Sequence, residues 1–200
     1  MRLRRPALVL AAAATISLGG NAFAAGPQSV TFTDPAKDNV SPTASGDITG
    51  VTFTTKGLGK GKGYTPKSLV VTLALGDVPG ANGTTQYQVG WTIEGCEYYM
   101  QAALGAKVFD TFGSASCGSA PDATGSDATS FGFSALPTGK SLVFKVLIKD
   151  LPNKVKPGVD LNALNAYADL VEPTGLIGAA SLGAGPLYDT AATTKDYTLG

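Results

Sequence analysis

Apolar and polar residues alternate along most of this chain from about residue 30 onward. Leu69, Val71 and Leu73 share one face of a segment, and Tyr87, Val89, Trp91 and Ile93 share one face of the next. A period of two places successive side chains on opposite faces of a β-strand. The pattern predicts strands in six segments: residues 30–32, 51–54, 69–75, 86–93, 96–102 and 142–149.

Segments rich in glycine, proline and small residues separate these strands, and we expect loops there. The expected loops are residues 57–63, 77–83, 113–130 and 152–158. Residues 160–171 fit two patterns, because Leu161, Leu164 and Ala168 have helical spacing while Leu164, Ala166 and Ala168 alternate; we favour the strand. Many short strands with Gly and Pro turns predict one all-β domain, an immunoglobulin-like or jelly-roll β-sandwich.

The first 24 residues have the layout of a secretory signal peptide. Arg2, Arg4 and Arg5 precede an apolar run at residues 7–18, and Ala22-Phe23-Ala24 is a small-x-small cleavage site. The alternative, an N-terminal anchor helix, is disfavoured because Gly19 and Gly20 interrupt a run that is already short for a bilayer. We therefore expect residues 25–200 to be a secreted, extracellular domain without a membrane span.

The charge of this expected domain excludes some partners. The leader holds three of the 15 basic residues, which leaves 12 lysines against 15 acidic residues and a net charge of −3. Nucleic-acid binders rely on Arg and Lys patches, so a mildly acidic domain without arginine is not expected to bind nucleic acid. The net charge also gives no reason to expect attraction to anionic membranes.

Cys96 and Cys117 are the two cysteines of the chain. In an oxidising compartment an even pair predicts a disulfide, which would stabilise the fold by about 3 kcal/mol on the chain-entropy model. A zinc site needs more ligands than two cysteines in a chain without histidine, and a Cys-x-x-Cys redox motif is absent. We therefore predict a structural disulfide.

The sequence argues against an enzyme. The absence of histidine excludes Ser-His-Asp and Cys-His catalysis, and the Gly-x-Ser-x-Gly and Ser-x-x-Lys motifs do not occur. A pair of carboxylates, as in glycosidases, is the chemistry that remains, and Glu94 and Glu97 are the candidates. Two acidic residues near a strand end are more often only solvated, so we expect no enzymatic activity.

Three aspartates flank an expected loop between two short strands. Asp34 and Asp38 could converge if the chain turns at Pro35, and Asp47 lies where the next strand begins. Calcium binds six to eight oxygens from carboxylates, carbonyls and water, so these residues are candidate calcium ligands. The alternative is that they only stabilise turns, since an Asp side chain bonds the backbone two residues on.

Aromatic residues give a second candidate site. Sugar-binding sandwiches stack aromatic rings on pyranose rings and add hydrogen bonds from amides or carboxylates. By parity Trp91 shares a face with Tyr87 and Ile93, so we expect it in the core. Tyr99 lies on the opposite face from Tyr98, and with Glu97 and Gln101 it forms the candidate ligand-binding set.

Three segments resemble a group of bacterial secreted proteins. Phe32-Thr33-Asp34-Pro35-Ala36-Lys37-Asp38 and Asp47-Ile48-Thr49-Gly50-Val51 resemble the opening of many uncharacterised secreted β-sandwich proteins. Tyr87-Gln88-Val89-Gly90-Trp91 resembles their middle hairpin, and Asp189-Thr190-Ala191 with Tyr197-Thr198-Leu199-Gly200 their last strand. Such domains are similar to carbohydrate-binding family 9 and DOMON-like sandwiches. The resemblance implies a binding domain, but not DOMON-type haem ligation, since the chain has no histidine.

The sequence thus leaves three functions, in order of preference. The first is a non-catalytic extracellular binding or accessory module with a calcium-stabilised loop. The second is a carbohydrate-binding module, which an exposed Tyr99 would favour. The third is a small hydrolase, which would need two carboxylates facing each other across a cleft.

Overall fold

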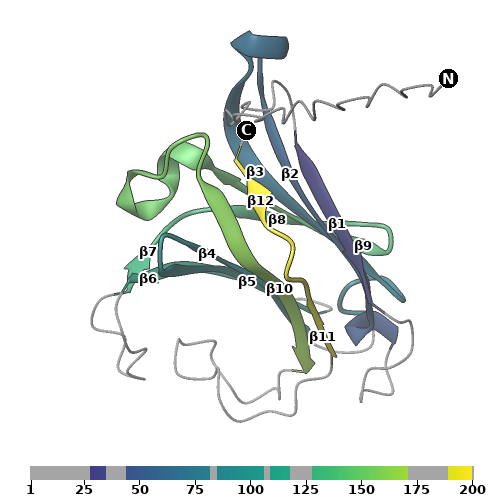
Figure 1. Cartoon of the computed structure of the whole chain (residues 1–200). Helices are drawn as coiled ribbons and strands as arrows, with labels where there is room; N and C mark the ends of the chain where they lie inside the picture. Colours follow the sequence, from purple (N-terminus) through teal and green to yellow (C-terminus); the bar gives the residue numbers. More distant parts are fainter. Residues whose placement is uncertain are drawn as a thin grey trace, which may run out of the picture.

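The computed structural model describes residues 28–34, 44–81, 85–105, 109–117, 128–170 and 189–199. These residues form two antiparallel sheets that face each other as a sandwich (Figure 1). Sheet 1 consists of β1 (Ser29–Thr33), β2 (Ile48–Leu58), β3 (Thr65–Leu75), β9 (Ser141–Leu147) and β8 (Ser134–Thr138), in that spatial order. Sheet 2 consists of β11 (Asp189–Ala192), β10 (Asp160–Leu170), β4 (Thr85–Ile93), β5 (Cys96–Leu104), β6 (Phe109–Cys117) and β7 (Thr129–Ser130), and β12 (Tyr197–Thr198) pairs with β10. The predicted all-β sandwich is confirmed.

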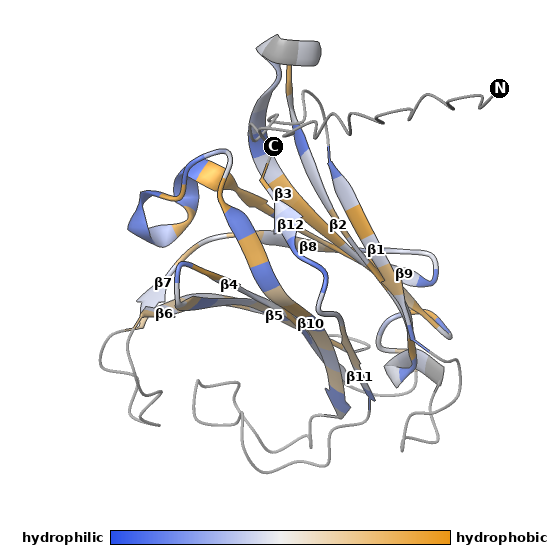
Figure 2. Cartoon of the chain, viewed as in Figure 1, coloured by the Kyte–Doolittle hydropathy of each residue, from blue (hydrophilic) through white to orange (hydrophobic). Residues whose placement is uncertain are grey.

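The alternation of the sequence is visible along the strands as alternating hydropathy, most clearly on β10 (Figure 2). The inward-facing side chains of both sheets form one core. Trp91 is only 1% exposed and stacks on Tyr98, with ring centroids 5.8 Å apart. Phe53 of the opposite sheet meets Trp91 edge-on at 6.4 Å, so aromatic contacts join the two sheets. Trp91 is therefore a core residue, as its parity predicts.

All six predicted strand segments lie on strands, although residues 148 and 149 belong to a short 3-10 turn, Ile148–Asp150. The prediction of a loop over residues 113–130 is wrong at both ends, because residues 113–117 continue β6 and Thr129–Ser130 form β7. The small side chains there suit a strand whose face is closely covered: a Cβ on Gly113 would lie 2.7 Å from the carbonyl oxygen of Phe131. The loop predicted at residues 57–63 begins two residues later, since β2 continues to Leu58.

The segment that fitted both helix and strand is β10. Its register against β4 shifts between Asn162 and Asn165, where Ala163 has a φ of 50°. This β-bulge inserts an extra residue, so Leu161 and Leu164 both face the core although they are three positions apart. The bulge explains why the strand imitates the apolar spacing of a helix.

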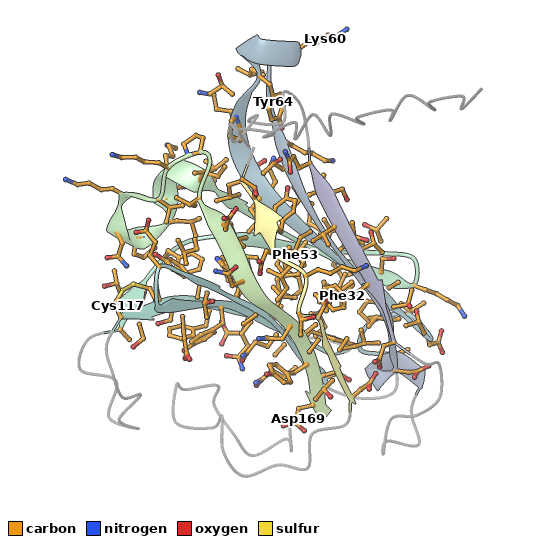
Figure 3. The ribbon with its side chains drawn as sticks, viewed as in Figure 1. Phe32, Phe53, Lys60, Tyr64, Cys117 and Asp169 are labelled. Atoms are coloured by element: carbon orange, nitrogen blue, oxygen red, sulfur yellow. A yellow bond between two sulfur atoms is a disulfide. The ribbon has the colours of Figure 1, made fainter. Side chains whose placement is uncertain are left out.

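The predicted disulfide is present. Cys96 and Cys117 lie directly opposite each other on β5 and β6, with Cα atoms 4.2 Å apart. Cys117 lies at the edge of sheet 2 (Figure 3). The Asn153 amide donates a hydrogen bond of 2.9 Å to the Cys117 sulfur and one of 3.3 Å to the Tyr98 hydroxyl. The disulfide therefore closes the β5–β6 pair and contacts the turn that follows β9.

Candidate functional site

The face of sheet 2 that points away from the core carries the best-defined set of polar and aromatic side chains. We call it the outer face. In one row across four strands, Tyr167 lies opposite Gln88, Gln88 opposite Gln101, and Gln101 opposite Phe112. The next row consists of Asn165, Gly90, Tyr99 and Ser114. The alternate residues of these strands, such as Val89 and Met100, are buried in the core. The strand pairing therefore gathers aromatic rings and amides from four strands.

Three aromatic rings on the outer face are partly exposed: those of Tyr99, Phe112 and Tyr167. The rings of Tyr99 and Phe112 are 5.9 Å apart between centroids and tilted by 49°. Tyr167 is on β10 and Tyr99 is on β5, with β4 between them. The strands β10 and β5 are therefore about 10 Å apart, measured across the sheet. Flat apolar rings at this separation can contact successive units of an extended ligand.

Two amides on the outer face have polar atoms without a hydrogen-bond partner. The Gln101 side chain is only 3% exposed, and its Nε2 has no acceptor. The Asn165 Nδ2 donates to the carbonyl oxygen of Ala163 at 2.9 Å, whereas its Oδ1 has no donor. A buried polar group without a partner destabilises a fold by about 1–3 kcal/mol, so such groups mark places where a water or a ligand binds. The outer face thus holds one donor and one acceptor that no protein group uses, and both atoms are buried.

Gly90 makes room for one of these amides. A Cβ at this position would lie 2.5 Å from the Asn165 Oδ1. Any larger residue at position 90 would displace the Asn165 side chain from the row that it shares with Tyr99. The glycine therefore allows two functional groups from different strands to stand side by side.

The three candidate ligand-binding residues differ in their exposure. Glu97 is exposed and pairs with Thr92, Tyr99 is partly exposed, and Gln101 is buried. All three lie on the outer face of β5. Reasoning from the sequence missed Tyr167, Phe112 and Asn165, which belong to β10 and β6. Alternation could place these residues on a face, but it could not reveal which strands pair with β4 and β5.

Two of the three candidate calcium ligands, Asp34 and Asp47, lie at the same end of the β1–β2 pair. The backbone N–H of Asp34 donates to the carbonyl oxygen of Thr49, and Asp47 is buried just before β2. The Asp189 carboxylate accepts a hydrogen bond from the N–H of Ile48, the residue that follows Asp47. Asp38 lies outside the described residues. The part of the chain that the structure describes contains no group of three or more His, Cys, Asp or Glu arranged to hold a metal ion.

The two glutamates considered for hydrolysis have different surroundings. Glu94 lies in the tight turn between β4 and β5 and lines a pocket of about 360 Å³, together with Tyr98, Asn153 and Lys156. Glu97 lies on the outer face of β5 and does not line this pocket. The pocket therefore does not bring together the two carboxylates that a glycosidase needs.

No family model, curated protein or solved structure matches this chain. Within the residues that the structure describes, no helix is long and apolar enough to cross a membrane. The chemistry of the outer face therefore provides the main evidence on function.

Proposed function

We propose that this protein is a non-catalytic extracellular binding module that holds a carbohydrate on the outer face of sheet 2. The observation that carries the proposal is the combination of three partly exposed aromatic rings with amide side chains on neighbouring strands. Aromatic rings bind the apolar faces of sugar rings, and amides hydrogen-bond the hydroxyls. Secretion is part of the proposal, supported by the leader-like first 24 residues and by the disulfide.

Each group on the face has a role in this proposal. Tyr99 and Tyr167 are the stacking platforms, and Phe112 supports Tyr99 from the side. Gln101 Nε2 and Asn165 Oδ1 have unused hydrogen-bonding capacity but are buried, so a ligand hydroxyl would accept from the first or donate to the second only once these amides turn outward. Because the two tyrosines stand on different strands, an oligosaccharide can contact both and should bind more tightly than its monosaccharide unit.

The test measures binding of the exported protein to a panel of oligosaccharides by affinity electrophoresis and calorimetry. We expect Tyr99→Ala and Tyr167→Ala each to weaken binding of the best oligosaccharide at least about tenfold, because each removes one stacking contact. Tyr64→Ala is the matched control, since Tyr64 is also partly exposed but lies in the β2–β3 hairpin, just before β3 and away from this face. Binding that both variants leave unchanged, or no binding to any glycan, would reject the carbohydrate as ligand.

A further inference from the structure

The β2–β3 hairpin extends beyond the rest of sheet 1. β1 pairs with residues 50–54 of β2, and β9 pairs with residues 68–74 of β3. The ends of β2 and β3 from Lys56 to Lys67 therefore pair only with each other in the sheet. Figure 1 shows this part projecting from the sandwich, and Figure 3 places Lys60 at its far end. We call residues 56–67 the hairpin tip.

The hairpin tip concentrates positive charge in an acidic domain. It contains four of the twelve lysines that follow the expected leader, at positions 56, 60, 62 and 67, and no acidic residue. The other residues of segment 25–200 carry eight lysines against 15 acids. The small net charge of the domain therefore hides a strong asymmetry, with a basic projection on an acidic body. An anionic surface would attract the tip and repel the remainder.

An exposed apolar side chain accompanies these lysines. Leu58 is 68% exposed, and in the sequence it stands between Lys56 and Lys60, which are also exposed. The turn beyond it is compact, since Gly59 has a φ of 87° and its missing Cβ would lie 2.3 Å from the carbonyl oxygen of Gly63. The projecting tip thus carries one exposed leucine on the same hairpin as the exposed Lys56, Lys60 and Lys67.

We propose that the hairpin tip docks the protein on the surface of an anionic phospholipid bilayer. Lysines near such a surface each add to the attraction, and an apolar side chain among them can enter the boundary between headgroups and acyl chains. The exposed Leu58 favours a bilayer over a soluble polyanion, because only the bilayer offers an apolar layer that this side chain can enter. Docking through the tip would hold the protein end-on and leave the outer face of sheet 2 free.

The test is cosedimentation of the exported protein with vesicles of phosphatidylcholine alone or mixed with phosphatidylglycerol. We expect binding only to the mixed vesicles, and less at high salt because ions screen the attraction. Replacing Lys56, Lys60, Lys62 and Lys67 by glutamine should weaken binding on the order of 100-fold or more. Leu58→Ser should weaken it about tenfold, because it removes the inserted side chain.

A matched control replaces four exposed lysines elsewhere by glutamine: Lys145, Lys149, Lys156 and Lys195. It changes the net charge equally and should retain most of the binding. Unchanged thermal midpoints will show that the variants are folded. Equal loss in both quadruple variants, or equal binding to neutral vesicles, would overturn the proposal. Binding to soluble polyphosphate as tight as to vesicles, with Leu58→Ser affecting neither, would also overturn it in favour of a polyanion site.

Discussion

The carboxylate of Asp189 accepts a hydrogen bond from the backbone N–H of Ile48, 141 positions earlier in the chain. Asp189 begins β11 in sheet 2, and Ile48 begins β2 in sheet 1, so this bond joins the two sheets at one end of the sandwich. Both residues are buried. A buried N–H that loses its acceptor destabilises a fold by more than an exposed one does.

We therefore predict that Asp189→Ala lowers the free energy of unfolding by about 1–3 kcal/mol. Asp189→Asn should lower it less, because the amide oxygen can still accept the bond. Urea denaturation measures both. Asp160→Ala is the control: it removes a hydrogen bond to the Thr198 hydroxyl on the exposed surface and should cost little. Equal losses of stability in Asp189→Ala and Asp160→Ala would mean that the cross-sheet hydrogen bond stabilises the fold no more than an exposed one does.

The cross-strand disulfide gives a second prediction. Replacing both Cys96 and Cys117 by alanine should lower the free energy of unfolding by about 3 kcal/mol, because the oxidised chain has a less flexible unfolded state. The same loss should follow from adding a reductant to the unsubstituted protein, and the reductant should not affect the double variant. A reductant that lowers the thermal midpoint of both proteins equally would contradict this interpretation.

The β-bulge on β10 predicts an unusual effect of glycine. Ala163 has a φ of 50°, a conformation that costs a non-glycine residue roughly 1 kcal/mol. Ala163→Gly should therefore leave the stability unchanged or raise it by up to about 1 kcal/mol. Ala166→Gly, at a buried and regular position of the same strand, should lower it by about 1 kcal/mol. Comparing the two urea midpoints checks the bulge directly, and a clear loss of stability in Ala163→Gly would argue against it.

Local patterns were sufficient to predict much of this fold, because each strand with one buried face shows it as alternation. Trp91 and Tyr98 were assigned to faces correctly for that reason. The bulge at Ala163 could not be predicted from the sequence. Its extra residue places two core-facing leucines three positions apart, a spacing that is also typical of a helix. The outer face was only partly visible. Tyr99 and Gln101 belong to one strand, whereas Tyr167 joins them from β10, which is distant in sequence, and Phe112 from β6, a strand that the alternation did not predict.

Two buried tyrosines predict a loss of stability at alkaline pH. Burial raises the pKa of Tyr87 and of Tyr197 above the ordinary value of 10.0, although hydrogen bonds partly offset this. In the unfolded chain these hydroxyls lose their protons at about pH 10, while in the folded protein they still hold them. The unfolded state then binds fewer protons, so stability is complete below about pH 10 and falls as the pH rises toward the folded pKa values.

Urea denaturation across this pH range measures the effect. Tyr87→Phe with Tyr197→Phe removes both ionisations, so its stability should fall less steeply above pH 10 than that of the unsubstituted protein. The double variant should be less stable at neutral pH, because the Tyr87 hydroxyl donates to the carbonyl oxygen of Ser45 and that of Tyr197 to the carbonyl oxygen of Gln28. If the stability of the two proteins falls equally steeply above pH 10, groups other than these tyrosines cause the loss of stability at alkaline pH.

The last prediction concerns calcium binding by the aspartates that precede β2. If Asp34, Asp38 and Asp47 bind calcium, the ion binds only the folded state and raises the thermal midpoint by mass action. We expect a higher midpoint in calcium than in chelator, and no such difference in Asp34→Ala or Asp38→Ala. Asp196→Ala, which removes an exposed acid elsewhere, should keep the difference. Identical midpoints of the unsubstituted protein in calcium and in chelator would contradict calcium binding and favour the alternative that these aspartates only stabilise turns.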